Sequence, residues 1–368
     1  MPEPLVLITK GLDPNPSGGR ELLCKLNYDA LQEIYNDQLI LIQLIHSPLR
    51  SANEYANTFR GHIDGLNSDT ITAAINKIKK KNVTRVFVDG SNLGGFVHIL
   101  KKTLPEVEIT TFFHNVESRF FLGSFRQRKS LRSFLILIAN YLAERKAVRY
   151  SDKIICLNQR DSDLLRKTYG RVATHIAPMA LEDKMPIGFG ERVPADDEDF
   201  ALFVGGTFYA NQAGITWFVK NVVPHIDIKI CIVGRGFEKL RDELEVPGKV
   251  EVVGAVDSLA VWYRRARFVI APIFDGSGMK TKVAEALMYG KKIVGTPEAF
   301  TGYEDIADQV GFICETSDQF VNAIRLLKLN MPIPFNPRLR EIYINNYSLT
   351  STISRLELIL NDTVSKRH

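Results

Sequence analysis

The sequence predicts an α/β protein built from two doubly wound domains, and three observations lead to this fold class. The chain has 368 residues, which is enough for two domains of ordinary size. Short β-branched and aliphatic runs alternate with segments of helical periodicity, a pattern typical of βαβ units around a parallel sheet. The alternation stops once, at a polar, proline- and acid-rich stretch near 178–199, and then restarts. We therefore expect one domain on each side of this stretch.

The first domain is predicted to contain five buried strands. Its clearest helix follows Asn67, Ser68 and Asp69, residue types that favour a helix start. The apolar residues of this helix recur on one face, at Ile71, Ala74, Ile75 and Ile78. The strands are expected at 5–8, 39–45, 83–89, 107–113 and 153–157.

The second domain repeats the alternation and is followed by a last amphipathic helix. A proline-rich segment at 331–337, which is expected to be loop-like, precedes this helix. We group the helix with the first domain, so the predicted domains are 1–178 with about 349–368, and 179–348. The strands of the second domain are expected at 201–204, 229–233, 250–253, 268–271 and 292–295.

Composition excludes several classes of protein. With 47 Lys and Arg against 42 Asp and Glu, the net charge of +5 is too small to indicate a nucleic-acid partner. Hydrophobic residues make up 45% of the chain, so wholesale disorder is not expected. No apolar run approaches the ~20 residues of a transmembrane helix, and the N-terminus shows no signal-peptide pattern. We expect a cytoplasmic protein whose membrane contact, if any, is peripheral.

Cysteines and acidic residues form no metal-site pattern. Cys24, Cys156, Cys231 and Cys314 are far apart and include no CxxC pair. Three of them lie in apolar, strand-like runs, as expected for reduced buried thiols. The acidic run 196–199 precedes a strand and is interpreted as a solvated linker. No metal and no cofactor are predicted.

The most informative segment is 271–290, where a buried strand, a Gly-Ser-Gly loop and a helix follow one another. Glycines let backbone N–H groups approach an anion, and the start of a helix adds positive potential. Lys280 and Lys282 add charge there, so the segment has the chemistry of a phosphate site. Glu285, about one turn into the helix, can accept hydrogen bonds from ribose hydroxyls. The alternative is a solvated loop with surface lysines.

This segment resembles the nucleotide-sugar site of GT-B glycosyltransferases, particularly the large retaining family 4 (glycosyl transferases group 1). Further pieces occur in the order that this family requires, and the resemblance spans nearly the whole chain. It implies two Rossmann-like domains facing across a cleft, with an acceptor domain first and a donor domain second. The further pieces are Ser17-Gly18-Gly19, His114-Asn115-Val116-Glu117, Val204-Gly205-Gly206 with Asn211 and Trp217-Phe218, Ile232-Val233-Gly234-Arg235-Gly236, and Val253-Gly254-Ala255-Val256.

The resemblance also implies roles for residues of the second domain. Glu285 is expected to bind the donor ribose, while Lys280 and Lys282 bind the diphosphate and stabilise it during catalysis. The segment around Val256 is expected to read the base through its backbone. The other donor-binding candidates are Gly206, Arg235, Asp275, Ser277, Gly278 and Met279, of which Arg235 is equally well explained as a surface residue beside a tight turn.

In the first domain, the resemblance implies donor and acceptor contacts. Gly18 and Gly19 resemble a turn whose amides reach the distal phosphate, although a plain turn and helix start explains them as well. His114 resembles a histidine near the transferred sugar. Alone it is more simply a half-buried structural histidine, but its place at a strand end favours a ligand role. Asn115 and Glu117 are candidates for orienting His114 or touching the acceptor.

The chain departs from the family pattern at two places. Many members carry two glutamates separated by seven residues, whereas eight positions before Glu285 stands Ser277. The usual carboxylate contact to the sugar ring is therefore missing or supplied by Asp275. Many members also have an Arg and a Lys in the turn that is Gly-Gly-Thr at 205–207 here. Diphosphate binding is expected to depend more on the two lysines of the 271–290 segment.

The segment from Phe120 to Tyr150 is both basic and apolar. One interpretation is a helix packed on the sheet with a basic solvent face, and the other is peripheral contact with an anionic membrane surface. Basic residues at 126, 128, 129 and 132 cluster beside the apolar run 134–138, and further basic residues follow at 145, 146 and 149.

Together these features predict a retaining glycosyltransferase of the hexosyltransferase type. It would transfer a sugar from a nucleoside-diphosphate sugar, with UDP favoured over GDP, to a hydroxyl of a glycan or lipid-linked acceptor in polysaccharide or glycan biosynthesis. The alternatives are another GT-B activity, such as a nucleotide-sugar epimerase, or a non-catalytic nucleotide-sugar-binding protein. A dehydrogenase is disfavoured because neither glycine-rich turn gives GxGxxG.

Overall fold

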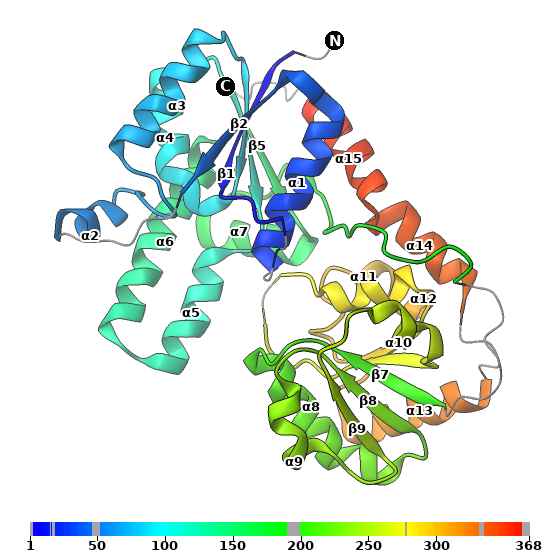
Figure 1. The fold of residues 1–368 in the computed structure, drawn as a ribbon. Coiled ribbons are helices and arrows are strands. Elements are labelled where there is room, and N and C mark those ends of the chain that lie inside the picture. The colour runs from blue at the N-terminus through cyan, green and yellow to red at the C-terminus, as the bar shows by residue number, and fades with distance from the viewer. Residues whose placement is uncertain are drawn as a thin grey trace. The chain divides into compact units, whose positions relative to one another are not determined.

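The computed structural model describes residues 3–14, 16, 19–45, 52–189, 199–276, 278–330 and 335–362. The chain divides into two compact units, which are treated separately below (Figure 1). Unit 1 comprises Met1–Met179 and Leu349–His368, and unit 2 comprises Ala180–Ser348. The chain thus enters unit 2 one residue after the predicted boundary at 178. Most of the predicted linker, 190–198, lies outside the described residues.

Unit 1 is built on a six-stranded parallel sheet in the order β2-β1-β3-β4-β5-β6. The five predicted strands all form, and a sixth, very short strand pairs at the edge. Its strands are mostly buried because helices cover the sheet, which explains their continuous apolar runs. The strands are β1 Leu5–Lys10, β2 Leu39–Leu44, β3 Arg85–Asp89, β4 Glu108–Phe113, β5 Lys153–Cys156 and β6 His175–Ile176.

The helices of unit 1 follow local sequence signals. The Asn67 side chain accepts a hydrogen bond from the backbone N–H of Thr70 and starts the predicted helix, whose four apolar residues are buried. The final helix packs against α1, as part of unit 1. The helices are α1 Gly19–Tyr35, α2 Ala52–Thr58, α3 Ser68–Lys80, α4 Gly94–Thr103, α5 Glu117–Arg128, α6 Leu131–Tyr150, α7 Gln159–Tyr169 and α15 Leu349–Asn361, with short 3-10 helices η1 Asn36–Gln38 and η2 Ser91–Leu93.

Unit 2 also has a six-stranded parallel sheet, in the order β12-β11-β10-β7-β8-β9. Here too the five predicted strands form and one short strand is additional. Its core is one cluster of apolar side chains from the strands and from α8 and α13. The strands are β7 Phe200–Val204, β8 Lys229–Val233, β9 Val250–Gly254, β10 Phe268–Ala271, β11 Ile293–Gly295 and β12 Gly311–Ile313.

The helices of unit 2 include one that the sequence analysis did not expect. The proline-rich segment was expected to be loop-like through 337, but Pro337 is the first residue of α14. Proline is favoured there because the first helical N–H needs no partner within the helix. The helices are α8 Tyr209–Asn221, α9 Arg241–Leu244, α10 Leu259–Arg265, α11 Thr281–Met288, α12 Ala307–Val310, α13 Ser317–Asn330 and α14 Pro337–Tyr347, with 3-10 helices η3 Val223–His225, η4 Phe237–Leu240 and η5 Glu304–Ile306.

Both strand orders place a switch point inside each sheet. In unit 1 the order reverses at β1 and β3, and in unit 2 it reverses at β7 and β10. Open parallel sheets bind ligands at the carboxyl ends of strands beside such a switch. The two predicted groups of site residues follow these strands. No helix among the described residues is long and apolar enough to cross a bilayer.

Candidate active site

Lys282 lies at the switch point of unit 2. It belongs to α11, which follows β10, yet its amine reaches the turn after β7: a Cβ atom added to Gly205 would lie 2.5 Å from Lys282 Nζ. The side chain is 8% exposed and its amine lies 5.5 Å from the centre of the Phe203 ring. Burial lowers the pKa of Lys282 to about 8. Within the described ranges, no carboxylate lies within ion-pair distance of this amine, and Glu285 on the same helix interacts with it only through the electrostatic field.

Lys280 has a different environment, although it is only two residues away. Its amine lies 2.8 Å from Glu298 Oε1 and donates a hydrogen bond to the carbonyl of Gly278 at 3.0 Å. The pair is largely buried, with Lys280 12% and Glu298 22% exposed at their side chains. The charge of Lys280 is therefore already balanced inside the unit. The diphosphate role of both lysines stays a prediction, and the geometry favours Lys282 as the stronger contributor.

Glu285 lies one helical turn after Lys282 and shares its face of α11. The buried hydroxyl of Tyr263 donates a hydrogen bond to Glu285 Oε2 at 3.2 Å, and the Tyr263 ring stacks on Tyr289 with centroids 4.4 Å apart. Burial raises the pKa of Glu285, and the Lys282 charge opposes this shift. One carboxylate oxygen is thus fixed by Tyr263. The predicted contact of Glu285 with the ribose hydroxyls stays a prediction.

Two glycine-rich turns pack closely beside Lys282. A Cβ atom on Gly234, whose φ is +151°, would lie 1.8 Å from the carbonyl oxygen of Gly205. The Gly205 N–H donates to Val233 at 3.0 Å, and the Gly234 N–H donates to Gly254 at 2.7 Å. These contacts hold the ends of β7, β8 and β9 together. The turns leave Gly206 and Arg235 exposed and Val256 half-buried.

The loop 275–279 separates into an exposed part and a buried part. Asp275 is exposed and accepts hydrogen bonds from the Tyr209 hydroxyl at 3.2 Å and from the Gly276 N–H at 2.8 Å. Gly278 has a φ of +62°, and the Met279 side chain is buried against Gly302. Ser277 lies outside the described residues. A donor contact by Met279 would therefore come from its backbone, because the side chain packs into the interior.

His114 and Asp89 form a buried pair in unit 1. His114 follows β4 and Asp89 ends β3, and their Nε2 and Oδ1 atoms lie 2.8 Å apart. Asp89 also accepts hydrogen bonds from the Asn27 amide and the Thr9 hydroxyl, each at 2.8 Å. Burial alone would raise the pKa of Asp89, but His114 and these two donors outweigh burial and lower it. The carboxylate therefore requires a proton on His114 Nε2, which leaves Nδ1 to accept a hydrogen bond.

His114 Nδ1 is buried and has no hydrogen-bond partner among the described residues. An unpartnered buried nitrogen is costly unless a ligand or water satisfies it. The structure thus leaves one ring nitrogen of the predicted His114 without a partner among the described residues, and its contact with the sugar stays a prediction. Sequence analysis missed Asp89, although an aspartate that ends a buried strand is the signal that could have found it.

Cys24 lies close enough to His114 and Asp89 for the three to be tested as metal ligands. Their ligand atoms lie within 4.8 Å of one another. Burial raises the pKa of the Cys24 thiol well above neutrality, so it stays protonated, whereas metals bind the thiolate. Asp89 already accepts three hydrogen bonds. The donor set does not fit a metal ion, and the expectation of a metal-free enzyme stays a prediction.

The two acceptor candidates lie beside this pair. Asn115 Oδ1 is buried without a partner within the described part of the chain. Glu117 begins α5 and is buried, and burial together with Glu144 and Asp64 raises its pKa to about 7 against the opposing charge of Arg20. Arg20, which sequence analysis did not select, forms an ion pair with Asp64 at 2.5 Å. No sequence signal marks this pair.

Glu144 is a further interior carboxylate that sequence analysis missed. It projects from α6 and accepts hydrogen bonds from the backbone N–H groups of Glu117 at 2.8 Å and Ser118 at 3.1 Å. It also accepts from the hydroxyls of Ser91 and Tyr169. Glu144 therefore caps α5 from a neighbouring helix and fixes the segment that carries Asn115 and Glu117.

The predicted glycine turn after β1 is only partly described. Gly19 is exposed at the start of α1, and an added Cβ atom there would meet no atom within 4 Å. Gly18 lies outside the described residues. Their proposed contact with the distal phosphate stays a prediction.

Comparison with known proteins finds a family match within unit 2. Residues 198–329, which lie almost wholly in the described part of unit 2, match the model of the family glycosyl transferases group 1. None of the curated proteins compared with this chain matches it.

Solved structures resemble the chain in fold over nearly its whole length. Sucrose-phosphate synthase from Thermosynechococcus elongatus has a TM-score of 0.70 at 14% identity, covering 98% of both chains. Anabaena HepE in complex with UDP has a TM-score of 0.68 at 12% identity, covering 97% of this chain and 99% of HepE. The lipopolysaccharide outer core galactosyltransferase WaaB has a TM-score of 0.64 at 12% identity, covering 97% and 98%. The predicted GT-B fold is confirmed.

Proposed function

We propose that this protein is a glycosyltransferase, which transfers a sugar from a nucleoside-diphosphate sugar, a UDP-sugar in preference to a GDP-sugar, with retention of configuration. The acceptor is a hydroxyl of a glycan or of a lipid-linked glycan in polysaccharide or glycan biosynthesis. The observation that carries the proposal is Lys282, a buried cation with no carboxylate at ion-pair distance in the described ranges, at the sheet switch point of the unit that contains the family match. Anabaena HepE, similar in fold, was solved with UDP and with UDP-glucose, which supports the choice of donor.

The proposed chemistry of unit 2 centres on the leaving diphosphate. As the glycosidic bond breaks, negative charge grows on the phosphate oxygens, and a fixed cation in a dry environment stabilises that charge strongly. Lys282 supplies the cation, and the exposed Gly206 turn supplies backbone donors beside it. Glu285, held by Tyr263, accepts from the ribose hydroxyls. In a retaining reaction of this family the phosphate itself takes the acceptor proton, so no protein nucleophile is required.

The proposed role of unit 1 is to hold hydroxyl groups. His114 Nδ1 accepts a hydrogen bond from a sugar hydroxyl, since Asp89 holds the proton on the other ring nitrogen. Asn115 and Glu117 lie beside it and contact the acceptor. A lipid-linked acceptor would bring the enzyme to the cytoplasmic face of a membrane, with peripheral contact through the segment from Phe120 to Tyr150.

The first experiment compares ligand binding and turnover in two variants. Lys282→Met keeps the length of the side chain and removes its charge, and Lys220→Met makes the same change at an exposed position of α8 in the same unit. Calorimetry with UDP, GDP, ADP, CMP and NAD should show one preferred nucleoside diphosphate. Lys282→Met should weaken its binding roughly 10- to 100-fold, as expected for loss of a charge-assisted hydrogen bond. Lys220→Met should bind as the wild type does.

Turnover then separates the proposal from its alternatives. Release of the nucleoside diphosphate that depends on an added acceptor supports the transferase. Conversion of the nucleotide sugar without any acceptor would indicate an epimerase, and tight binding without turnover would indicate a binding protein. Equal nucleotide affinity in Lys282→Met and the wild type would refute the donor site.

A further inference from the structure

The hairpin of α5 and α6 carries an unusual surface. The two helices pack along each other and extend beyond the sheet of unit 1 (Figure 1). Between Ser118 and Ala143 the sequence has five Lys and Arg and no Asp or Glu. Among the described residues, none of these five basic side chains forms an ion pair with a carboxylate. The hairpin is therefore a one-signed basic surface, unlike the rest of a chain whose net charge is only +5.

Large apolar side chains are exposed on the same hairpin. Leu131, the first residue of α6, is 74% exposed, and four more apolar side chains are each roughly 40% exposed. An exposed apolar group of this size beside cations favours a surface that is itself both apolar and anionic. The four are Phe120, Phe134, Leu135 and Ile136.

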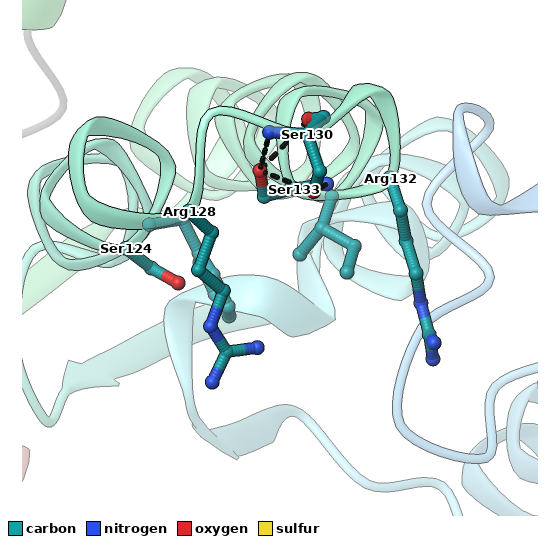
Figure 2. Close-up of a pocket in the computed structure, with 7 residues that line it drawn as sticks. Ser124, Arg128, Ser130, Arg132 and Ser133 are labelled. Atoms are coloured by element: carbon teal, nitrogen blue, oxygen red, sulfur yellow. Dashed lines mark hydrogen bonds between the residues drawn. The ribbon is translucent and has the colours of Figure 1, made fainter.

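A pocket of about 230 Å³ lies at the turn between the two helices. Arg128 and Arg132 line it from α5 and α6, and Figure 2 shows both side chains extending to the same side of the hairpin. Ser130 and Ser133 cap the start of α6 through a reciprocal pair of hydrogen bonds, which fixes the turn that separates the two arginines. Guanidinium groups are favoured partners of phosphate oxygens. Ser124 lines the same pocket.

We propose that the α5–α6 hairpin tip binds an anionic phospholipid bilayer, with Arg128 and Arg132 holding a lipid phosphate in the pocket and Leu131 entering the acyl region. This inference deepens the peripheral membrane contact of the proposed function and depends on it. Charge complementarity selects the bilayer, because between Ser118 and Ala143 the hairpin has only basic charged residues around its exposed apolar residues. Aliphatic stems of the arginines lie along the apolar surface while their heads reach the phosphates.

Sedimentation with lipid vesicles tests this inference on the full chain. The wild type should bind phosphatidylcholine vesicles that contain phosphatidylglycerol and bind pure phosphatidylcholine vesicles much less. Arg128→Gln/Arg132→Gln should lower the partition coefficient roughly tenfold or more, since each basic residue near the surface contributes about 1 kcal/mol. Lys79→Gln/Lys80→Gln, at exposed positions in the last turn of α3, makes the same charge change and should bind as the wild type does.

A second pair of variants tests the apolar contact. Leu131→Gln should also weaken vesicle binding, whereas Leu358→Gln, at an equally exposed position of α15, should not. The inference would be overturned if the wild type bound neutral and anionic vesicles equally well. It would also be overturned if the double arginine variant bound anionic vesicles as the wild type does. A third result would also overturn it: inorganic phosphate stabilises the wild type, this stabilisation depends on Arg128, and vesicles do not bind. The pocket would then hold a free anion.

The donor site provides an independent readout. UDP affinity should be unchanged in the hairpin variants, since their substitutions lie in unit 1 and Lys282 lies in unit 2. Vesicle binding that fails while UDP binds would refute the hairpin inference alone. Vesicle binding that succeeds while no nucleotide binds would refute the donor assignment alone.

Discussion

At the scale of single residues, the environment of a charge decides what it can do. Lys280 and Lys282 are the same residue type two positions apart, but Lys280 forms an ion pair with Glu298, whereas Lys282 lies against a ring and a backbone turn and interacts with Glu285 without a direct ion pair. A cation that is already ion-paired gains less from a phosphate than a buried cation without a direct ion pair. The sequence pattern Lys-x-Lys contains no information on this difference, because Glu298 is sixteen residues or more away along the chain.

The buried carboxyl of Glu117 gives a prediction on stability and pH. Its pKa is raised from an ordinary 4.5 to about 7, so between these values the unfolded chain ionises while the folded chain keeps its proton. Stability is therefore lost as pH rises through this window, and the whole loss is present above pH 7. Glu117→Gln should be more stable than the wild type at about pH 8, by up to about 3 kcal/mol, and similar to it at about pH 4.

Denaturant unfolding of both proteins at the two pH values measures the difference. Glu106→Gln, at an exposed position of the same unit, controls for the loss of one carboxylate. An advantage of Glu117→Gln that is the same at both pH values would contradict a carboxyl that is protonated in the folded state.

At the scale of elements, close packing between turns positions the donor site. The turns after β7 and β8 approach so closely that Gly234 has no room for a side chain. The glycines at 205 and 234 were visible in the sequence, and their positions after predicted strands indicated tight turns. The contact between the two turns could not be read from the sequence, because it follows from the pairing of β7 with β8, which aligns the carboxyl ends of these strands. The helix α11 then adds Lys282 from the other side of the switch point.

Gly234→Ala should abolish nucleotide binding, because its Cβ atom would lie 1.8 Å from the Gly205 carbonyl oxygen and push the turns apart. Gly248→Ala is the matched control: Gly248 also has a positive φ, +72°, but an added Cβ atom meets nothing within 4 Å. The control should lose only about 1 kcal/mol of stability, because alanine strains the backbone at this φ. It should keep its UDP affinity. Calorimetry with UDP and denaturant unfolding distinguish the two. Nucleotide binding by Gly234→Ala at wild-type affinity would show that the turns tolerate separation.

At the scale of the whole molecule, the C-terminal helix α15 belongs to unit 1, together with the N-terminal part of the chain. The carbonyl of Leu360, near the end of α15, accepts hydrogen bonds from Arg85 at 3.2 Å and from the buried Lys153 at 3.4 Å. Positive charge at the C-terminal end of a helix is favourable. Unit 1 therefore needs both ends of the chain, and unit 2 is inserted between them.

This organisation allows ligand binding to be assigned to one unit. The chain has two tryptophans, Trp217 and Trp262, and both lie in unit 2. UDP at a hundredfold excess over Kd should therefore raise the free energy of unfolding, followed by tryptophan fluorescence, by about 2.7 kcal/mol. Lys282→Met, whose UDP affinity is expected to fall roughly 10- to 100-fold, should gain only about 0.4 to 1.4 kcal/mol at the same UDP concentration. If UDP stabilised only signals that report unit 1, the assignment of the donor site to unit 2 would be wrong.

The sequence by itself determined the fold class, the ten longer strands, the main helix starts and the glycine-rich turns, because periodicity and turn chemistry are local properties. It also placed His114 at a strand end and Glu285 on a helix. The tertiary structure alone decided that Asp89 holds His114, that Glu144 caps α5 and that Lys282 faces the turn after β7. The physical reason is that a parallel sheet gathers strand ends by their lateral order, which is unrelated to distance along the chain.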